Sequence, residues 1–331
     1  MNQHKYPLYR NYYNLDPEHI KSLASKLLKS FKDNTSSIQL KIHKDTKKII
    51  NKNNVLLLPY CCKSEKKYII IYDKWFYDLE LKKITDYFTQ DQRIKARFGN
   101  NISPLDYFNK NYEIINNKFN NFINLDYSKF DDYMFQHIKF CNNLSLSFIL
   151  YILYIFKPKT WLDISAGWGD RLLGAILYGV DEYYASDPNK DLHKGYKEIK
   201  KTFLPKEKRK NFKIKPVGFE NLNITKKYDI VFTSPPFFDL EIYSSHSEDS
   251  WVVYKSRESW YKNFFLKIVQ KAAKHINKCG HLVLYLNFTP EYTKRMLKDI
   301  NNQNKNLSFM GCFYYNNGNL LRPTYIWQKI E

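Results

Sequence analysis

The chain has 331 residues, of which 44% are hydrophobic and 17% aromatic, and its 53 Lys and Arg residues outnumber its 33 Asp and Glu residues by 20. This much apolar material excludes a disordered chain, and no glycine period, heptad or internal repeat points to a collagen, a coiled coil or a solenoid. The length fits one large domain, or a catalytic domain of about 180 residues with a second module.

The positive charge by itself leaves a nucleic-acid partner open. It comes from 45 Lys and only 8 Arg, and Asn, Ile and Tyr are also abundant, as an AT-rich genome would encode in almost any protein. A face built to grip phosphate would rely more on Arg. Residues 1–150 carry a net charge of +9 and the rest +11, so the excess is evenly divided between the two halves.

The five Cys residues form no C-x-x-C pair and no Cys/His group at zinc spacing, so we expect no metal and a reduced chain. The first ten residues are polar, without an apolar signal segment. The longest apolar run, residues 144–156, is too short to span a bilayer and predicts a buried helix. We therefore expect an intracellular, cytoplasmic protein with no membrane contact.

The first 135 residues are rich in Lys and Asn. Apolar spacing predicts a helix over 20–31, strands over 55–58 and 68–72 around a polar connection, and a helix over 79–98 that ends before Ser103-Pro104. Arg93 and Arg97 would share one face of that last helix, where they could bind phosphates of a substrate. A solvated helix face is the alternative interpretation.

From residue 144 onward, predicted strands and helices alternate. A helix over 144–156 precedes strands over 160–164, 182–186, 212–217, 228–232 and 281–286, with helices over 170–178, 190–202 and 260–277 between them. The chain ends in two strands joined by a turn at 316–319. This order predicts an α/β fold in which a mostly parallel sheet is covered on both faces and carries an antiparallel hairpin at one edge.

The turn after the first of these strands is a candidate nucleotide site. Asp163 ends the strand, and Gly167-x-Gly169 leads into a helix, so the backbone can approach a ligand and the helix start offers free N–H groups. The third Gly of a dinucleotide site and the Lys of a P-loop are both absent. Asp187 ends the next strand, where its carboxylate could accept hydrogen bonds from two ribose hydroxyls; a chain turn before Pro188 is the alternative.

A second turn, Ser234-Pro235-Pro236-Phe237, follows the fourth strand. The two prolines fix the backbone and remove two N–H donors. The Pro235 carbonyl and the Ser234 hydroxyl can then accept hydrogen bonds from an amino group and expose its lone pair, while Phe237 offers a face on which a base can stack. A simple strand-ending Pro-Pro turn is the alternative, and the position after a Gly-x-Gly turn favours the functional interpretation.

Together the two turns resemble the class I, S-adenosylmethionine-dependent amino-methyltransferases of nucleic acids, and residues 161–174 and 231–243 resemble phage- and virus-type DNA methylases. The resemblance covers residues 144–331 and leaves 1–143 as an α+β accessory module for substrate recognition. It implies a Rossmann-like sheet of order 3-2-1-4-5-7-6 with strand 7 antiparallel, near 322–327. A viral source would place the protein in the host cell or a viral factory.

The resemblance also implies roles for individual residues. Ser234, Pro235, Pro236 and Phe237 would be catalytic. The cofactor, S-adenosylmethionine, would be held at its methionine end by the first turn, at its ribose by Asp187 and near its adenine by Glu220. The residues implied for the methionine end are Asp163, Ser165, Gly167 and Gly169.

The implied reaction is site-specific methylation of adenine N6 or cytosine N4, with DNA as the first substrate. Ser234, at the first position of the second turn, and the order of the two motifs leave the target base open. The alternatives are RNA methylation at N6-adenine or N2-guanine, a cofactor-dead subunit that binds nucleic acid, and methylation of a protein Gln or Asn amide.

No large recognition insert separates the two turns or follows the last predicted strand, so we expect recognition from the N-terminal module, from the loop 239–259 or from a partner subunit. In that loop, Tyr243 or Trp251 could stack on a flipped base, and His246 is interpreted as solvent-exposed. The Lys/Arg run over 200–215 is interpreted mainly as a solvated surface, with phosphate contact as the alternative.

Overall fold

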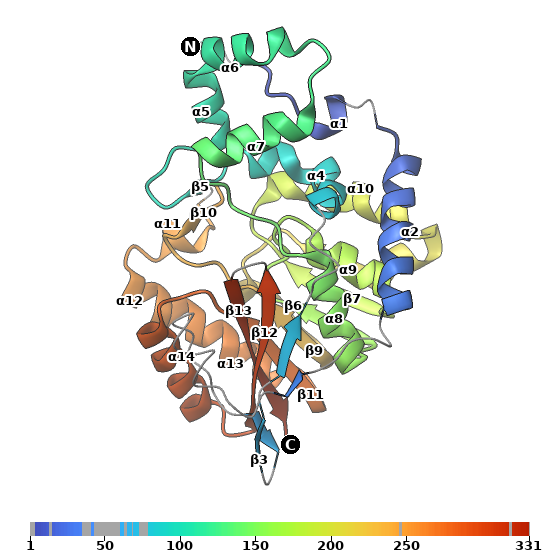
Figure 1. The fold of residues 1–331 in the computed structure, drawn as a ribbon. Coiled ribbons are helices and arrows are strands. Elements are labelled where there is room, and N and C mark those ends of the chain that lie inside the picture. The colour runs from blue at the N-terminus through green and yellow to red at the C-terminus, as the bar shows by residue number, and fades with distance from the viewer. Residues whose placement is uncertain are drawn as a thin grey trace.

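The computed structural model describes residues 4–12, 15–34, 41–42, 60–62, 65–67, 69–72, 79–244, 247–317 and 320–330. A nine-stranded sheet, β1-β4-β12-β13-β11-β9-β6-β7-β8, crosses the molecule (Figure 1). Its strands are β1 (Lys41–Ile42), β4 (Ile69–Tyr72), β6 (Thr160–Asp163), β7 (Glu182–Ser186), β8 (Phe212–Lys215), β9 (Tyr228–Thr233), β11 (Ile276–Tyr285), β12 (Leu307–Asn317) and β13 (Leu320–Lys329).

The order of the strands is the one expected from the sequence. With β6 counted as the first strand, the segment from β8 to β12 runs 3-2-1-4-5-7-6. The strands β8, β7, β6, β9 and β11 are parallel to one another, and β13 lies antiparallel to both β11 and β12. The prediction of a Rossmann-like class I methyltransferase sheet is therefore confirmed.

Helices cover both faces of this sheet, and alternate side chains of each strand enter different cores. Trp161 belongs to the core beneath α8, α9 and α10, whereas Leu162 belongs to the core beneath α13 and α14. Five of the six β9 residues are buried, as expected of a strand covered on both sides. The covering helices are α8 (Leu146–Phe156), α9 (Asp170–Tyr178), α10 (His193–Phe203), α13 (Leu266–Lys274) and α14 (Pro290–Gln303).

Two predictions in this region need correction. The helix predicted over 260–277 is built of α12 (Arg257–Trp260), a π-helical turn η6 (Tyr261–Phe265) and α13, and β11 already begins at Ile276. The helix α14 is the second correction, since no helix is predicted there. Thr289 caps this helix and Pro290 begins it, while Met296, Leu297 and Ile300 are buried at helical spacing, so the pattern for it was present.

The N-terminal part joins the same sheet. The prediction of a helix over 20–31 is confirmed by α2 (Pro17–Asn34), and β4, which covers the strand predicted over 68–72, pairs in parallel with β12. The strand predicted over 55–58 lies outside the described residues. The further N-terminal helices and strands are α1 (Tyr9–Tyr12), β2 (Tyr60–Cys62), β3 (Glu65–Lys67), α4 (Leu79–Arg93), α5 (Pro104–Lys110), α6 (Tyr112–Lys118), η2 (Asn120–Phe122) and α7 (Tyr127–His137).

The prediction that Arg93 and Arg97 share a helix face is wrong. The helix α4 ends at Arg93, and Arg97 belongs to β5 (Arg97–Phe98), which pairs with β10 (Glu241–Ile242). Pairing with a strand more than 140 residues away satisfies the backbone there, and local spacing contains no information about such a partner. The solvated-face interpretation also fails for Arg93, because its side chain is 1% exposed.

The remaining short elements connect the sheet to its helices. No helix in the described part of the chain combines the length and the apolarity needed to cross a membrane. The short elements are η3 (Lys190–Leu192), η4 (Lys206–Asn211), η5 (Phe219–Asn221) and α11 (Ser250–Val253).

Candidate active site

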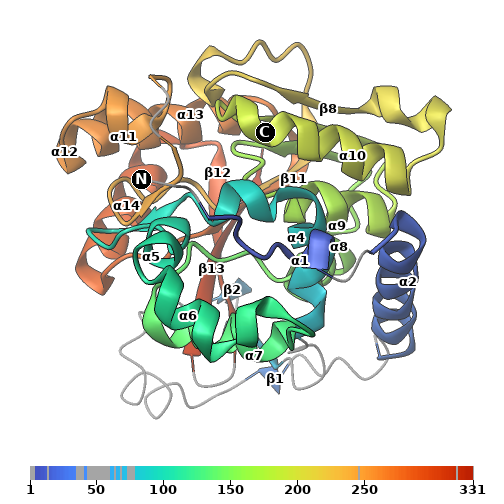
Figure 2. The ribbon, with the colours of Figure 1, turned by 90° about the horizontal axis from the view of Figure 1, so that it is seen from above.

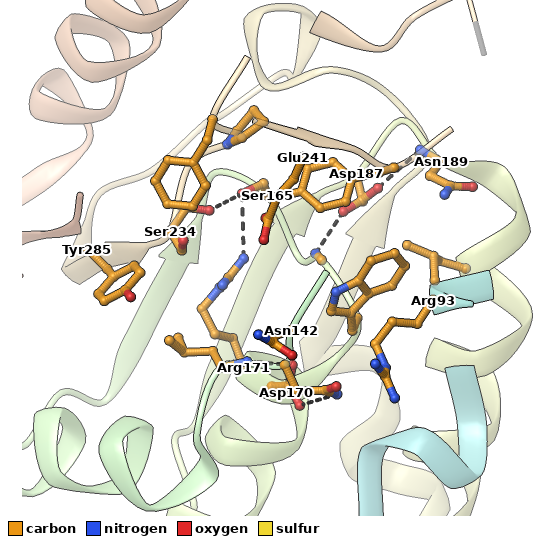
Figure 3. Close-up of a pocket in the computed structure, with 18 of the residues that line it drawn as sticks. Arg93, Asn142, Ser165, Asp170, Arg171, Asp187, Asn189, Ser234, Glu241 and Tyr285 are labelled. Atoms are coloured by element: carbon orange, nitrogen blue, oxygen red, sulfur yellow. Dashed lines mark hydrogen bonds between the residues drawn. The ribbon is translucent and has the colours of Figure 1, made fainter. Parts of the chain in front are cut away.

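A cavity of about 1000 Å³ lies where the parallel strands end, and it is lined by both predicted turns (Figure 3). Segments from the N-terminal part, among them Phe98 and residues 138–140, complete the wall. Four predicted site residues, Asp163, Gly169, Pro235 and Arg97, lie off the wall. The predicted residues that do line the cavity are Ser165, Gly167, Asp187, Glu220, Ser234, Pro236, Phe237, Tyr243, Trp251 and Arg93.

The turn over residues 165–169, called here the glycine turn, has the positive backbone φ angles that its two glycines predict. Gly167 and Gly169 have φ angles of +60° and +99°, which favour glycine. A Cβ at Gly169 would also lie 2.8 Å from the Cδ1 atom of Ile199. The Gly167 N–H donates a hydrogen bond of 2.8 Å to the Asp187 carboxylate, and Thr89 of α4 donates one of 2.8 Å to the Trp168 carbonyl. The turn is thus held from both sides.

Asp163 lies beneath the turn, which corrects the expectation that it lines the methionine end. Its carboxylate is fully buried and accepts hydrogen bonds from Arg171 at 2.8 Å and from the Tyr183 hydroxyl at 2.6 Å. Arg171, which the sequence analysis does not single out, lines the cavity in its place, with a nitrogen 3.5 Å from the Ser165 hydroxyl. Asp163 therefore does not line the cavity, but it positions Arg171, which does.

Two buried carboxyl groups flank the turn. Asp187 accepts hydrogen bonds from the backbone N–H groups of Gly167 and Asn189, and burial raises its pKa to about 7. Asp170, at the start of α9, accepts hydrogen bonds of 3.2 Å from the Asn143 amide and the Leu144 N–H, and burial raises its pKa to about 6. Both groups change charge near neutral pH.

The turn Ser234-Pro235-Pro236-Phe237, called here the proline corner, lies directly beside the glycine turn. The Ser165 hydroxyl donates a hydrogen bond of 3.0 Å to the Ser234 carbonyl and lies 3.2 Å from the Thr233 hydroxyl. Phe237 is 6% exposed and packs edge-on against Phe288 and Tyr285, with ring centres 5.2 and 6.4 Å away. These contacts fix the Phe237 ring, and Tyr285 lies beside it on the cavity wall.

A third loop, after β8, carries Glu220. The Lys271 ammonium of α13 donates hydrogen bonds to the carbonyls of Phe219, Glu220 and Leu222 at 3.0, 2.8 and 2.7 Å. Within the described part of the chain, the Glu220 Oε2 atom is buried without a hydrogen-bond partner. Burial raises the pKa of this carboxyl. A buried acceptor on a cavity wall is suited to a ligand that brings a donor.

The loop 239–259 is attached to the N-terminal part. Within it, β10 pairs with β5, and the Gly99 N–H donates a hydrogen bond of 2.8 Å to the Leu240 carbonyl. The Trp251 ring lies 5.9 Å from the Arg97 guanidinium, and its N–H donates to the Ser244 carbonyl. Position 246 lies outside the described residues. The β5 region and the loop 239–259, which lie far apart in sequence, thus form one wall of the cavity.

The cavity is acidic although the chain is strongly basic. Seven carboxyl groups line it, against three cationic side chains. Of these cations, Arg93 and Arg171 are already paired with Asp86 and Asp163. Among the residues that the structure describes, no group of three or more His, Cys, Asp or Glu side chains is placed to hold a metal ion. The cavity therefore favours a cationic ligand over an anionic one.

Several wall residues are not among those predicted from the sequence. Arg171 and Asp170 follow the glycine turn directly, and a charged pair at a helix start was the available indication. Glu241, Asn142 and Tyr285 come from segments that no local motif connects with the turn. Figure 3 shows these side chains around the same space as Ser165 and Ser234.

Comparison with known proteins finds likeness in three dimensions only. No family model and no curated protein matches the chain. Solved structures that resemble it include a methyltransferase from Pyrococcus furiosus, with 16% identity, 55% of this chain and 83% of that chain covered, and a TM-score of 0.37. TrmN from Thermus thermophilus matches with 14% identity, 56% and 49% coverage, and a TM-score of 0.41. An S-adenosylmethionine-dependent O-methyltransferase from Thermotoga maritima matches with 12% identity, 56% and 64% coverage, and a TM-score of 0.36.

Proposed function

We propose that this chain transfers a methyl group from S-adenosylmethionine to the exocyclic amino group of a nucleobase, adenine N6 or cytosine N4, with DNA as the substrate. The observation that carries the proposal is the meeting of the two turns. The Ser165 hydroxyl of the glycine turn donates a hydrogen bond to the Ser234 carbonyl of the proline corner, and both residues line one cavity. A donor site and an acceptor site in contact are what a group transfer requires.

The cavity fits the proposed cofactor. S-adenosylmethionine carries a sulfonium and an ammonium, and the excess of carboxyl groups on the wall favours such a cation. Asp187 would accept hydrogen bonds from its ribose, and the unpaired Glu220 Oε2 atom would accept one from its adenine amino group. Ser165 and Gly167 would line its methionine end, with Arg171 of the same wall beside them.

The chain's own residues would orient the target. When bound, the cofactor supplies an electrophilic methyl group. The Ser234 hydroxyl, on the cavity wall, would accept one N–H bond of the amino group and help to expose its lone pair. Pro235 is buried off the wall, so its carbonyl would reach the amino group only if the corner shifts when the substrate binds. Phe237, held edge-on by Tyr285 and Phe288, would stack on the base. Burial of this corner would exclude water from the reacting nitrogen.

The N-terminal part would contribute to substrate recognition in this proposal. Phe98 of β5 and Trp251 lie on the same wall, and the pairing of β5 with β10 joins the first 143 residues to the loop after the corner. We therefore propose residues 1–143 as an accessory module for recognition and 144–331 as the methyltransferase region. Tyr243 and Trp251 would contact the flipped base, or a neighbouring base.

The proposal is tested by incubating the protein with labelled S-adenosylmethionine and separate pools of duplex DNA, RNA and protein, followed by digestion and identification of the modified unit. We expect N6-methyladenine or N4-methylcytosine from DNA. Label in RNA nucleosides would move the substrate to RNA, and label in a Gln or Asn amide would move it to protein. Cofactor binding without label in any pool would support a subunit that requires a partner, and the absence of binding would overturn the proposal.

A further inference from the structure

We infer that one outer edge of the molecule binds the phosphate backbone of the nucleic acid. The surface, called here the basic edge, consists of the exposed side of α10 with η4 and β8, residues 190–215. The inference rests on the proposed function and adds a second contact region outside the cavity. Figure 2 shows α10 and β8 side by side at one margin of the molecule, away from α14.

The positive charge is concentrated at this edge. Residues 190–215 carry ten Lys and one Arg against three acidic residues, a net charge of +8 of the +20 of the whole chain. A bias of the genome toward Lys would raise the charge everywhere and cannot account for such a concentration in 26 residues. The even division between the two halves of the chain therefore hides a local excess.

The lysines of α10 form one stripe. Lys194, Lys197 and Lys201 are spaced by three and four residues, so they project from the same side of the helix, and all three are exposed. The opposite side, with Gly195, Tyr196 and Ile199, is buried. The helix can therefore present its cations outward without disturbing its packing.

Little at the basic edge neutralises this charge. Glu198 is paired with Arg10, and Lys190 lies 3.7 Å from Glu248. Within the described residues, no ion pair within 4 Å involves any other cation of residues 190–215. Burial lowers the pKa of the Lys200 ammonium, and the neighbouring charges of Lys197 and Arg209 lower it further. Like charges thus repel one another here, and a bound polyanion would relieve the repulsion.

The cavity itself cannot supply the contacts to phosphate. Its wall carries more carboxyl groups than cations, so it would admit a neutral base and repel the backbone that carries it. Affinity for a nucleic acid depends on neutralising phosphates, and the cations for this must lie outside the cavity. The acidic cavity would bind the target base, and the basic edge would bind the phosphates of the backbone.

The basic edge begins at the cavity. Asn189 and Leu192 line the cavity, and α10 starts at the next residue, His193. A helix of 11 residues extends for about 16 Å. This corresponds to about five base pairs of duplex. A duplex with its target base in the cavity could therefore lay one flanking backbone along α10.

Protection of an edge strand is the competing explanation for part of this charge. β8 lies at one end of the sheet, and Lys213 and Lys215 are exposed on it. Lysines on such a strand prevent its pairing with another chain. That role does not apply to α10, because a helix has no open strand edge to protect. Substitution of the lysines of α10 therefore tests phosphate binding alone.

The test compares two variants of equal charge. Lys194→Gln, Lys197→Gln and Lys201→Gln are combined in one chain. The control combines Lys294→Gln, Lys298→Gln and Lys305→Gln, which are exposed on or just after α14, on a different side of the molecule. Binding to a labelled duplex of about 30 base pairs is measured by fluorescence anisotropy from 50 to 200 mM salt. A third variant, with Lys194→Arg, Lys197→Arg and Lys201→Arg, keeps the charge and should retain binding.

We expect the α10 variant to weaken duplex binding by at least about tenfold. The slope of log binding constant against log salt concentration should become less steep by about 2 to 3, while both quantities in the control stay near those of the wild type. Both variants should keep their affinity for S-adenosylmethionine. Equal effects of the two variants would overturn the inference and leave the proposed function intact if the wild type still methylates DNA. If the wild type does not bind the duplex, the inference fails, and the digestion experiment decides separately whether a nucleic acid is the substrate.

Discussion

Ser165 donates a hydrogen bond of 3.0 Å to the carbonyl of Ser234 and so joins the glycine turn to the proline corner. Loss of such a bond costs about 1 kcal/mol, and here it would also release the corner from its position beside the turn. We expect Ser165→Ala to lower kcat by about tenfold and, because Ser165 also lines the proposed methionine end of the cofactor, to raise the Kd for S-adenosylmethionine by a smaller factor of about threefold. Single-turnover kinetics and calorimetry measure the two quantities.

A nearby serine provides the control for this variant. The Ser186 hydroxyl donates a hydrogen bond of 2.9 Å to the Ile164 carbonyl and is buried in the same region, without touching the corner. Ser186→Ala should lower stability by a similar amount and leave kcat close to that of the wild type. Equal losses of kcat in the two variants would show that the bond to Ser234 has no special role.

Phe237 tests the stacking face of the corner. Its ring is held by Tyr285 and Phe288, so its removal should leave the target base without a fixed plane. We expect Phe237→Ala to reduce turnover by more than about 100-fold with little change in cofactor affinity, because stacking and orientation serve the acceptor alone. Phe237→Tyr keeps the aromatic face and should retain most of the activity. A large loss of cofactor affinity in Phe237→Ala would contradict this assignment.

Asp187 should make cofactor binding depend on pH. Burial raises its pKa to about 7, so the carboxyl carries a proton at lower pH and is then a weaker acceptor for the ribose hydroxyls. We expect affinity for S-adenosylmethionine to rise with pH, by up to about tenfold per unit below 7, and to level off above it. Calorimetry across this range in several buffers measures the effect.

Two variants identify the group responsible for that pH dependence. Asp187→Asn cannot ionise, so its affinity should be weak and independent of pH in this range. Asp170→Asn should leave the dependence near pH 7 in place, because the pKa of Asp170 is raised only to about 6 and this carboxyl is already used by Asn143 and Leu144. An unchanged pH profile in Asp187→Asn would assign the effect elsewhere.

The inner strands of the parallel sheet could be predicted from the sequence because they are mostly buried. β7 has the predicted bounds, and β9 differs from its prediction by one residue. The start of β11 could not be found in this way. Between the buried Ile276 and Gly280, the residues Asn277, Lys278 and Cys279 form no apolar run, and the register with β9 shifts between Ile276 and His281. Their pairing depends on the neighbouring strand and not on their own pattern.

The candidate site was predictable where its chemistry is local in sequence. The glycine turn, Asp187 and the proline corner are short motifs at strand ends, and the fold brings them together as expected of that position. The role of Arg171 was not predictable, because it follows from the packing of Asp163 against Tyr183, 20 residues further along the chain. The wall formed by β5 depends on pairing across more than 140 residues.

Lys271 should act as a positioning residue for the loop that carries Glu220. Its ammonium holds three carbonyls of this loop, and Lys271→Met would remove all three hydrogen bonds at once. We expect the Kd for S-adenosylmethionine to increase by about tenfold or more while kcat at saturating cofactor is nearly unchanged. Lys267→Met changes an exposed lysine of the same helix and should have no effect. Equal effects of the two variants would contradict this role.

Arg93 should stabilise the fold and not bind phosphate. Its guanidinium forms two hydrogen bonds with the Asp86 carboxylate, at 2.8 and 2.6 Å, and the two side chains are only 1% and 4% exposed. Arg93→Met would leave a buried charge unpaired, at a cost of about 3 to 5 kcal/mol in unfolding free energy, and the double variant with Asp86→Leu should recover part of it. Urea denaturation measures these values. A stable Arg93→Met with a reduced salt slope for duplex binding would instead assign Arg93 to the substrate.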